Sequence, residues 1–257
     1  MALTLSVLLA LSCFACKPKE EEQVIEEGPP AYESPYDWSC LKHEDNRISY
    51  MKGWTPASLT GIDVSEHQGV INWDAVAADG IDFAIIRLGN RGYTDGETRL
   101  DDRAYANIEG ARNAGIKVGV YFFSQAITVQ EAIEEADLVI RALEGISLDY
   151  PVFYDHETVS DNKGRANSLT NDQLTKNTRA FCERVEGAGF VAMVYGNKKS
   201  FEKIDSELRD RYGVWFAEYG VMTPSAQFDF IIWQYSSSGS VAGIATQVDM
   251  NIHFLYP

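Results

Sequence analysis

Short apolar runs recur along the chain from residue 61 almost to its end. Each is three to six residues long and rich in valine, isoleucine and aromatic residues, as buried strands are. The runs are Gly61–Val64, Phe83–Leu88, Val118–Phe123, Val152–Tyr154, Phe190–Tyr195, Val214–Ala217, Phe230–Tyr235 and Val248–Met250. This pattern predicts eight strands.

Helix-like segments separate the earlier runs. The clearest are Asp101–Ala114, Val129–Leu143 and Asn171–Ala188, and a glycine follows each within two residues. Strands that alternate with helices predict a parallel sheet, and eight such strands in about 200 residues suit a closed barrel. The last three runs lie too close together for full helices between them. We therefore predict an α/β fold, an irregular TIM-like barrel with fewer helices on its C-terminal side.

The composition limits the kinds of partner that the chain can bind. Of its 257 residues 45% are hydrophobic, which is enough to bury a full core. The formal net charge of −16 argues against nucleic acid, whose phosphates would be repelled. It also argues against electrostatic adsorption to an anionic membrane.

The N-terminus has the features of an export signal. Residues 2–15 are nearly all apolar, yet too few to span a membrane. Small residues precede both Cys13 and Cys16, which resembles the cleavage site of bacterial lipoproteins, where the cysteine after the cut carries the lipid. We expect an exported protein, anchored through Cys16 or Cys13 and facing the periplasm or the cell surface. An ordinary cleaved signal is the alternative.

Three segments are expected along the chain. Residues 1–16 form the signal, and residues 61–257 form the barrel domain. Between them, residues 17–60 combine a glutamate-rich tether, too polar to fold on its own, with an extension that contains several aromatic residues. Export would permit a disulfide between Cys40 and Cys182, which the sequence alone does not establish.

The stretch 151–157 (PVFYDHE) contains a pair of acids at the end of a predicted strand. Side chains on a strand alternate between its faces, so Asp155 and Glu157 point the same way, about 7 Å apart along the backbone. Two carboxyls this close raise the pKa of one of them. A protonated carboxyl beside an ionised one is what glycoside hydrolysis requires. The alternative is a strand that simply ends in solvent.

Acids and aromatic residues also follow other predicted strands. In a parallel α/β barrel the site forms at the carboxyl ends of the strands. The residues expected there, besides Asp155 and Glu157, are Asp63, Tyr121, Phe122, Tyr195, Trp215, Glu218, Gln234, Tyr235 and Asp249. Aromatic faces stack on sugar rings, and carboxylates handle protons and cationic character. We therefore expect a glycan-binding site.

Several motifs, in order, resemble glycoside hydrolase family 25, the Chalaropsis-type lysozymes or N-acetylmuramidases. They are GIDVSEHQGVINW, FAIIRLGNRGY, AGIKVGVYFF, PVFYDHE and IIWQYSSSGSVAGI followed by VDMN. The resemblance covers residues 61–257. It implies cleavage of the β-1,4 bond from N-acetylmuramic acid to N-acetylglucosamine in peptidoglycan. Members are usually discussed as retaining enzymes assisted by the substrate, and the stereochemical course stays open here.

The resemblance also implies roles for four residues. Glu157 matches the proposed general acid, and Asp155 matches the carboxylate that orients the 2-acetamido group of the substrate. Asp63 and Asp249 match further acids of the site. Phe122 and Glu218 depart from the family pattern, which often has a histidine and an amide or basic residue at these positions. If the sixth predicted strand brings Glu218 to the rim of the site, this residue adds negative charge near Asp155 and Glu157; the alternative is that Glu218 points into solvent.

Two other functions remain possible on the sequence alone. A barrel of this kind could bind a glycan without cleaving it, or it could act on chitin-like polymers. No motif for a metal or a cofactor is recognisable, so we expect none. Peptidoglycan strands are the expected partner, and we expect the protein to be monomeric.

Overall fold

A computed structural model of the chain describes residues 32–45, 47–160 and 163–255. The chain divides after Tyr32 into two compact units, and the second of them begins at Glu33. The expected signal at residues 1–16, with Cys13 and Cys16, lies outside the described residues. No helix in the described ranges is long and apolar enough to cross a membrane.

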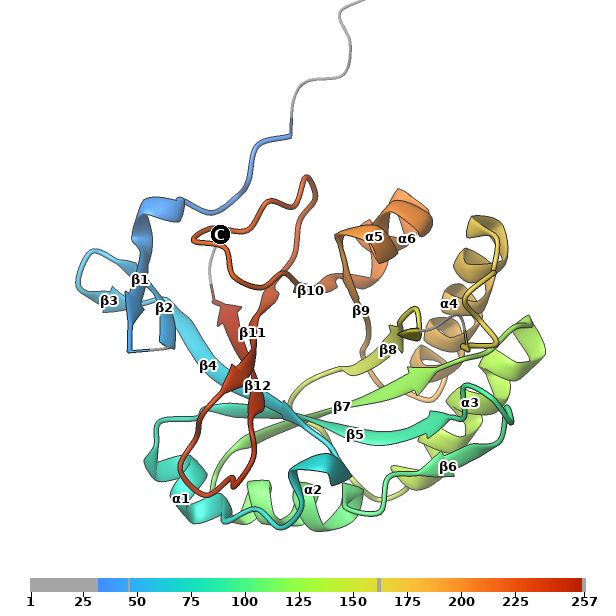
Figure 1. Ribbon diagram of the computed structural model, residues 1–257, viewed down its shortest axis with the longest axis horizontal. Helices are drawn as coiled ribbons and strands as arrows, with labels where there is room; N and C mark the ends of the chain where they lie inside the picture. Colours follow the sequence, from blue (N-terminus) through green and yellow to red (C-terminus); the bar gives the residue numbers. More distant parts are fainter. Residues whose placement is uncertain (1–31, 46, 161–162, 256–257) are drawn as a thin grey trace, which may run out of the picture. The chain divides into compact units, whose positions relative to one another are not determined.

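Eight strands close into a barrel (Figure 1). They are β4 (Ser58–Val64), β5 (Phe83–Arg91), β7 (Lys117–Ser124), β8 (Val152–His156), β9 (Ala192–Asn197), β10 (Val214–Ala217), β11 (Ile232–Gly239) and β12 (Val248–Phe254). Their order is β4-β12-β11-β10-β9-β8-β7-β5, and pairing of β4 with β5 closes the ring. The short strand β6 (Thr98–Leu100) extends β5 as an antiparallel neighbour. The predicted TIM-like barrel is confirmed.

The last strand runs against the others. β12 is antiparallel to both β11 and β4, whereas the remaining barrel pairs are parallel. The predicted parallel arrangement therefore holds for the other barrel strands and not for β12. The loop from β11 to β12 contains no helix, so the chain turns back as a hairpin instead of crossing over. The start of β12, not its end, lies at the carboxyl edge of the other strands.

Helices cover the barrel unevenly. They are α1 (Trp73–Ala78), α2 (Ala104–Asn113), α3 (Val129–Ala142), α4 (Asn171–Glu186), α5 (Lys198–Lys203) and α6 (Ser206–Tyr212), with 3₁₀ turns η1 (Trp38–Cys40) and η2 (Glu66–Gln68). Thr170 caps α4, since its side chain accepts a hydrogen bond from the backbone N–H of Gln173. After β9 the described helices are only six and seven residues long, and loops connect β10, β11 and β12. The expected scarcity of helices on this side is confirmed.

The extension before the barrel is folded. Strands β1 (Leu41–Glu44), β2 (Arg47–Lys52) and β3 (Thr55–Pro56) form a small antiparallel sheet. The Tyr36 hydroxyl donates to the Phe230 carbonyl at 2.9 Å, and the Tyr36 ring lies 4.4 Å from that of Phe254. Trp54, at the turn between β2 and β3, is by contrast 98% exposed. Tyr36 thus packs against the outer surface of the barrel.

Two layers of apolar side chains surround each strand of the barrel. One layer fills the barrel itself, with Phe83, Phe153 and Trp215 among its largest members, and the other lies between strands and helices. Burying one such side chain contributes about 1.5–3 kcal/mol. A Cβ on Gly61 would lie 2.2 Å from the ring of Phe83, so the glycine makes room for this ring. Cys182 packs in the outer layer, and both Cys40 and Cys182 are free thiols.

Candidate active site

Four carboxyl side chains meet at one end of the barrel. Asp63 is near the end of β4, Asp155 is near the end of β8, Glu157 follows β8 directly, and Asp249 is the second residue of β12. They lie close enough for their charges to interact: Glu157 acts on the other three, and Asp63 acts on Asp155. The structure therefore brings together the four acids that the sequence singled out.

Burial and mutual repulsion make these acids retain protons. Burial raises the pKa of Asp63 and of Asp155 well above the usual value, and the neighbouring carboxylates raise both further. Burial and the charge of Glu157 raise the pKa of Asp249 to about 6. Burial also raises the pKa of Glu157, and the neighbouring Tyr195 hydroxyl partly offsets this rise. A site of this kind supplies a proton near neutral pH.

A network of amides and hydroxyls fixes Asp63. Its Oδ2 accepts hydrogen bonds from Gln234 Nε2 at 2.6 Å and from Asn251 Nδ2 at 2.8 Å. Gln234 in turn accepts from the Tyr195 hydroxyl at 2.8 Å, and Asn251 Oδ1 accepts from Trp215 Nε1 at 2.8 Å. Each amide is thus oriented by a donor on one side and an acceptor on the other.

The Asp155 side chain has an unused hydrogen-bond acceptor. Its side chain is 5% exposed, and its Oδ1 has no hydrogen-bond partner among the described residues. Buried polar atoms in folded proteins are nearly always paired. An unpaired oxygen in the floor of a site is therefore available to a donor on a ligand.

Glu157 lies where two pockets meet. The larger, of about 970 Å³, extends toward β9 and α5, and Tyr195, Tyr219, Lys199 and Lys203 are in its wall. The smaller, of about 690 Å³, extends toward η2, β5 and β6. Glu157 and Thr158 line both. A polymer can therefore pass over Glu157 and occupy a pocket on each side.

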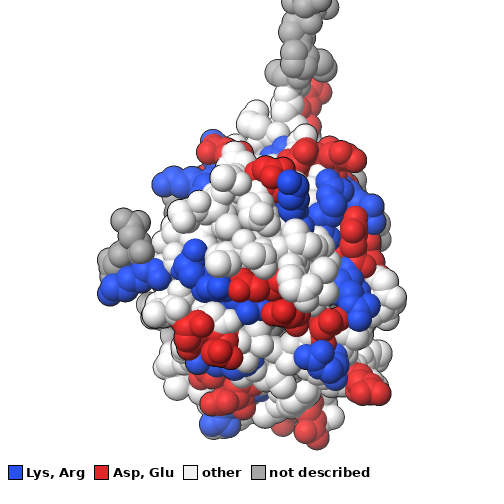
Figure 2. All heavy atoms as spheres, turned by 90° about the vertical axis from the view of Figure 1, so that its right-hand side faces the viewer, with Lys and Arg blue, Asp and Glu red and all other residues white. Residues whose placement is uncertain are grey.

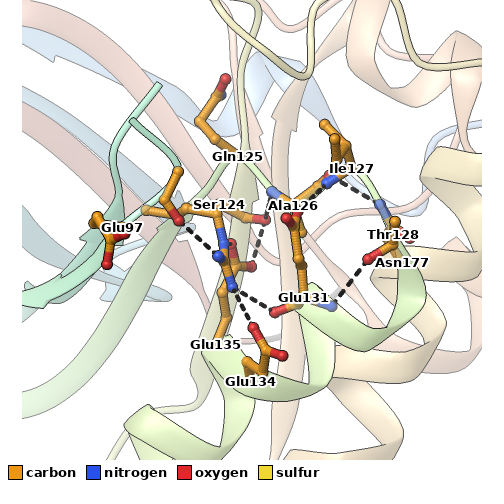
Figure 3. Close-up of polar contacts among 12 residues, drawn as sticks. Glu97, Ser124, Gln125, Ala126, Ile127, Thr128, Glu131, Glu134, Glu135 and Asn177 are labelled. Carbon is orange, nitrogen blue, oxygen red and sulfur yellow. Dashed lines mark hydrogen bonds and ion pairs between the residues drawn. The ribbon is translucent and has the colours of Figure 1, made fainter. Parts of the chain in front are cut away.

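The segment that carries Glu157 is held from below by Gln125. Gln125 Nε2 donates to the backbone carbonyl of Glu157 at 3.0 Å. The carbonyl of Gln125 accepts from Arg165 at 3.1 Å, and Arg165 makes two hydrogen bonds of 2.8 Å to Glu131 of α3. Figure 3 shows how the residues that follow β7 lie against α3 here. The position of Glu157 is thus fixed through its backbone carbonyl.

A buried ion pair lies behind the same region (Figure 3). Arg91 Nε donates to Glu135 Oε1 at 2.8 Å, and the two side chains are 5% and 0% exposed. Ser124 Oγ donates to Glu135 Oε2 at 2.6 Å. Burial raises the pKa of Glu135 to about 7 despite these partners. The pair joins the end of β5 to α3 and so supports the rim of the barrel.

Four of the expected contact residues point into the barrel. Tyr195 lines the larger pocket, and Gln234 binds Asp63. Trp215 is 1% exposed and lies below Tyr195, with the ring centroids 4.4 Å apart. The Tyr121 ring packs edge-on against Trp215. Trp215 therefore forms the floor of the site.

Two expected contact residues point the other way. Phe122 is completely buried in the layer between strands and helices, against Phe181 of α4. Tyr235 is buried in the same outer layer, beside Trp233. Their inclusion in the site is wrong, because alternation on a strand turns the neighbours of Tyr121 and Gln234 to the opposite face.

Glu218 lies in the wall of the larger pocket, but its carboxylate has its own partners. It accepts hydrogen bonds from the backbone N–H of Ser225 at 2.7 Å and from the Ser225 hydroxyl at 2.6 Å. Burial, not Glu218, is the leading cause of the raised pKa of Glu157. The expected influence of Glu218 on the acid is therefore not supported.

Three polar residues of the site were not recognised from the sequence. Asn251 shares a strand face with Asp249, and Gln125 follows β7. Arg87 on β5 is held by Asp101 at 2.8 Å and by Glu66 at 2.9 Å, and its charge lowers the pKa of Asp155. The two-residue period along the strands could have identified Asn251, and also Arg87, two residues after the inward-facing Ile85.

Comparisons with known proteins agree on one family. The family model described as glycosyl hydrolases family 25 matches residues 62–244. The autolytic lysozyme of Clostridium acetobutylicum is 29% identical over 194 residues, which are 75% of this chain and 55% of that protein.

Solved structures show the same fold. The modular autolysin LytC from Streptococcus pneumoniae superimposes with a TM-score of 0.69 and 25% identity, over 82% of this chain and 51% of that one. A bacterial lysozyme from Streptomyces coelicolor superimposes with a TM-score of 0.65 and 29% identity, over 75% of this chain and 90% of that one. The chain spans about half the length of the clostridial lysozyme and of LytC.

Proposed function

The chain belongs to glycosyl hydrolase family 25, and from this we propose that it is a muramidase that hydrolyses peptidoglycan. The bond cleaved is the β-1,4 linkage from N-acetylmuramic acid to N-acetylglucosamine. The clostridial and Streptomyces coelicolor relatives are named lysozymes, and LytC is described in complex with a synthetic peptidoglycan ligand. The observation that carries the proposal is the position of Glu157, a proton-retaining acid at the junction of two pockets.

Glu157 acts as the general acid. Burial raises its pKa, which favours the protonated form, and it is the least enclosed carboxyl of the cluster, together with Asp249. It gives its proton to the glycosidic oxygen as the bond to the sugar carbon breaks. The hold of Gln125 on its backbone supports this role, because proton transfer depends on position.

Asp155 positions the acetamido group of the muramic acid residue. Its unpartnered Oδ1 is suited to accept the amide N–H, which turns the amide oxygen toward the anomeric carbon. In the substrate-assisted course that oxygen, and not an enzyme carboxylate, attacks the carbon as the leaving oxygen takes the proton. The pair of Asp63 and Asp249 supplies one negative charge that stabilises the cationic transition state.

Cell walls and chitin oligomers together test this function. The purified protein should clear a suspension of cell walls and leave chitin oligomers intact. Binding to walls without clearing would favour the glycan-binding barrel. Cleavage of chitin oligomers at a similar rate would favour the chitin-like polymers as substrate.

The protein acts outside the cytoplasm as a monomer, on peptidoglycan strands as its partner. The apolar residues 2–15 and the cysteines Cys13 and Cys16 support an exported, lipid-anchored form. The glutamate-rich segment that follows would then connect the anchor to the barrel and let it reach the wall.

A further inference from the structure

We propose that the larger pocket binds the peptide stem of peptidoglycan through Lys199 and Lys203 of α5, which take its carboxylates. The inference rests on the proposed function and adds to it a preference for glycan strands that carry peptides. Muramic acid bears the stem on its lactyl group, and the stem contains free carboxylates. The stem therefore has to leave the sugar-binding groove close to the reacting bond.

The position of the two lysines supports this assignment. Both line the pocket of about 970 Å³ that Glu157 also lines. In the part of the chain that the structure describes, no carboxylate lies within ion-pairing distance of either amine. Elsewhere on the helical face, basic and acidic residues alternate (Figure 2), and pairs such as Arg184 with Asp137, at 2.6 Å, neutralise each other. No described carboxylate therefore neutralises Lys199 or Lys203, and both amines can pair with an anionic ligand.

Helix stability accounts for only one of these lysines, since Lys203 lies in the last turn of α5, where a positive charge interacts favourably with the helix dipole. Lys199 and Lys203 are four residues apart, so they share one face of α5, and like charges at this spacing weaken a helix. The helix is fixed nonetheless, because Asn197 accepts a hydrogen bond from the backbone N–H of Ser200 and Phe201 is buried beneath it. Its rigid attachment to the end of β9 presents both amines to the pocket.

A buried histidine adds a second observation. His156 is 6% exposed and lines the same pocket, and its Nδ1 has no hydrogen-bond partner among the described residues. Burial, helped by the charge of Lys203, lowers its pKa to about 4, so the imidazole is neutral. A neutral ring beside two amines offers a peptide one further hydrogen-bonding atom. The other acidic residue that lines this pocket is Glu218, and its carboxylate accepts two hydrogen bonds from Ser225.

The acidic character of the chain means that such a ligand needs cations close to its binding site. The net charge is −16, and four carboxyls line the catalytic end of the barrel. An anionic stem would be repelled there without local cations. Arg87, in the smaller pocket, does not serve, because Asp101 and Glu66 already neutralise it.

The test compares glycan strands with their stems and the same strands after an amidase has removed them. The variants are the double substitution Lys199→Gln with Lys203→Gln, and the matched control Lys198→Gln, which removes an exposed charge of the same helix outside the pocket. Wild type should show a higher kcat/KM on the strands with stems. In the double variant this preference should fall about three- to tenfold, which is the effect expected from losing two solvent-accessible ion pairs. Its kcat/KM on bare strands should equal that of wild type. The control should behave as wild type.

Binding of a disaccharide-peptide, measured by calorimetry, separates the possible failures. An unchanged preference in the double variant, or an equal loss in the control, would overturn the peptide site and leave the muramidase function standing. Lysine-dependent binding without turnover of either substrate would overturn the muramidase function and leave the peptide site. Wild-type protein that prefers bare strands would contradict the inference directly.

Discussion

Asp63 and Asp249 face each other across the antiparallel strands β4 and β12. The negative charge of Asp249 raises the pKa of Asp63, and a hydrogen bond with Asp63 favours the ionised form of Asp249. Asp63 Oδ2 is occupied by Gln234 and Asn251, which leaves its other oxygen for the shared proton. The pair thus holds one proton and one charge beneath the substrate.

The raised pKa of Asp249 makes the folded protein less stable as the pH rises. The pKa of Asp249 is about 6 in the folded protein and near 4 when unfolded, so the folded state binds the proton more tightly. Between these values the free energy of unfolding falls with pH, by at most about 1.4 kcal/mol per pH unit for one group. Asp249→Asn removes this loss. Its Tm should exceed that of wild type at pH 7, and the difference should shrink toward pH 4.

The control for that experiment is Asp210→Asn, which changes an exposed aspartate of α6. Its Tm should follow that of wild type at every pH. Parallel curves for wild type and Asp249→Asn would show that Asp249 titrates alike in both states, contrary to the structure.

Tyr195 tunes the catalytic acid. Its hydroxyl lowers the pKa of Glu157, so Tyr195→Phe should raise that pKa further. Glu157 would then stay protonated to higher pH, and the alkaline limb of kcat/KM should move up. The measurement is kcat/KM against pH on a soluble muropeptide. In Glu218→Gln the limb should stay in place, because Ser225 already holds that carboxylate. If the alkaline limb of kcat/KM does not move in Tyr195→Phe, the Tyr195 hydroxyl binds Gln234 and has no effect on the pKa of Glu157.

The buried pair of Arg91 and Glu135 should dominate local stability. Glu135→Gln leaves the guanidinium buried without its counter-ion, which costs about 3 kcal/mol. Glu134→Gln removes another partner of the same arginine, 3.4 Å away and 52% exposed, and should cost about 1 kcal/mol or less. Urea unfolding of both variants gives the comparison. If both variants lost the same free energy of unfolding, burial of the Arg91–Glu135 pair would not be the source of its larger contribution.

The proposed anchor makes a prediction about fractionation. Wild-type protein should sediment with membranes and enter the detergent phase, and replacing both Cys13 and Cys16 should release it, because neither candidate lipidation site of the signal then remains. Lysis of walls by the released protein should persist. A wild-type protein recovered wholly soluble and starting beyond residue 16 would rule out the lipoprotein form.

Much of the fold and site followed from local patterns. Apolar runs located the eight barrel strands, and the two-residue period placed Asp155 and Glu157 on one face. The same period, applied consistently, would have turned Phe122 and Tyr235 away from the site. Their misplacement came from treating a whole strand end as exposed to the pocket.

Other features have no local signal. An apolar strand looks the same in either direction, so the sequence did not show that β12 is antiparallel. Asp249 lies at the expected end of the barrel because β12 is antiparallel, which places the start of this strand at the carboxyl edge of the others. The hairpin of β1 and β2 is short, and its buried residues Leu41, Ile48 and Tyr50 are not consecutive, so it lacks the apolar runs of the barrel strands. The hold of Gln125 on Glu157 depends on packing between distant segments.

The most direct test is the identity of the reducing ends that the protein releases from peptidoglycan. Wild type should expose N-acetylmuramic acid, as mass spectrometry of the reduced fragments would show. Glu157→Gln, which keeps the shape of the side chain but cannot donate the proton, should release these fragments about 10²–10⁴-fold more slowly. Fragments that end in N-acetylglucosamine, or near wild-type release by Glu157→Gln, would contradict the account.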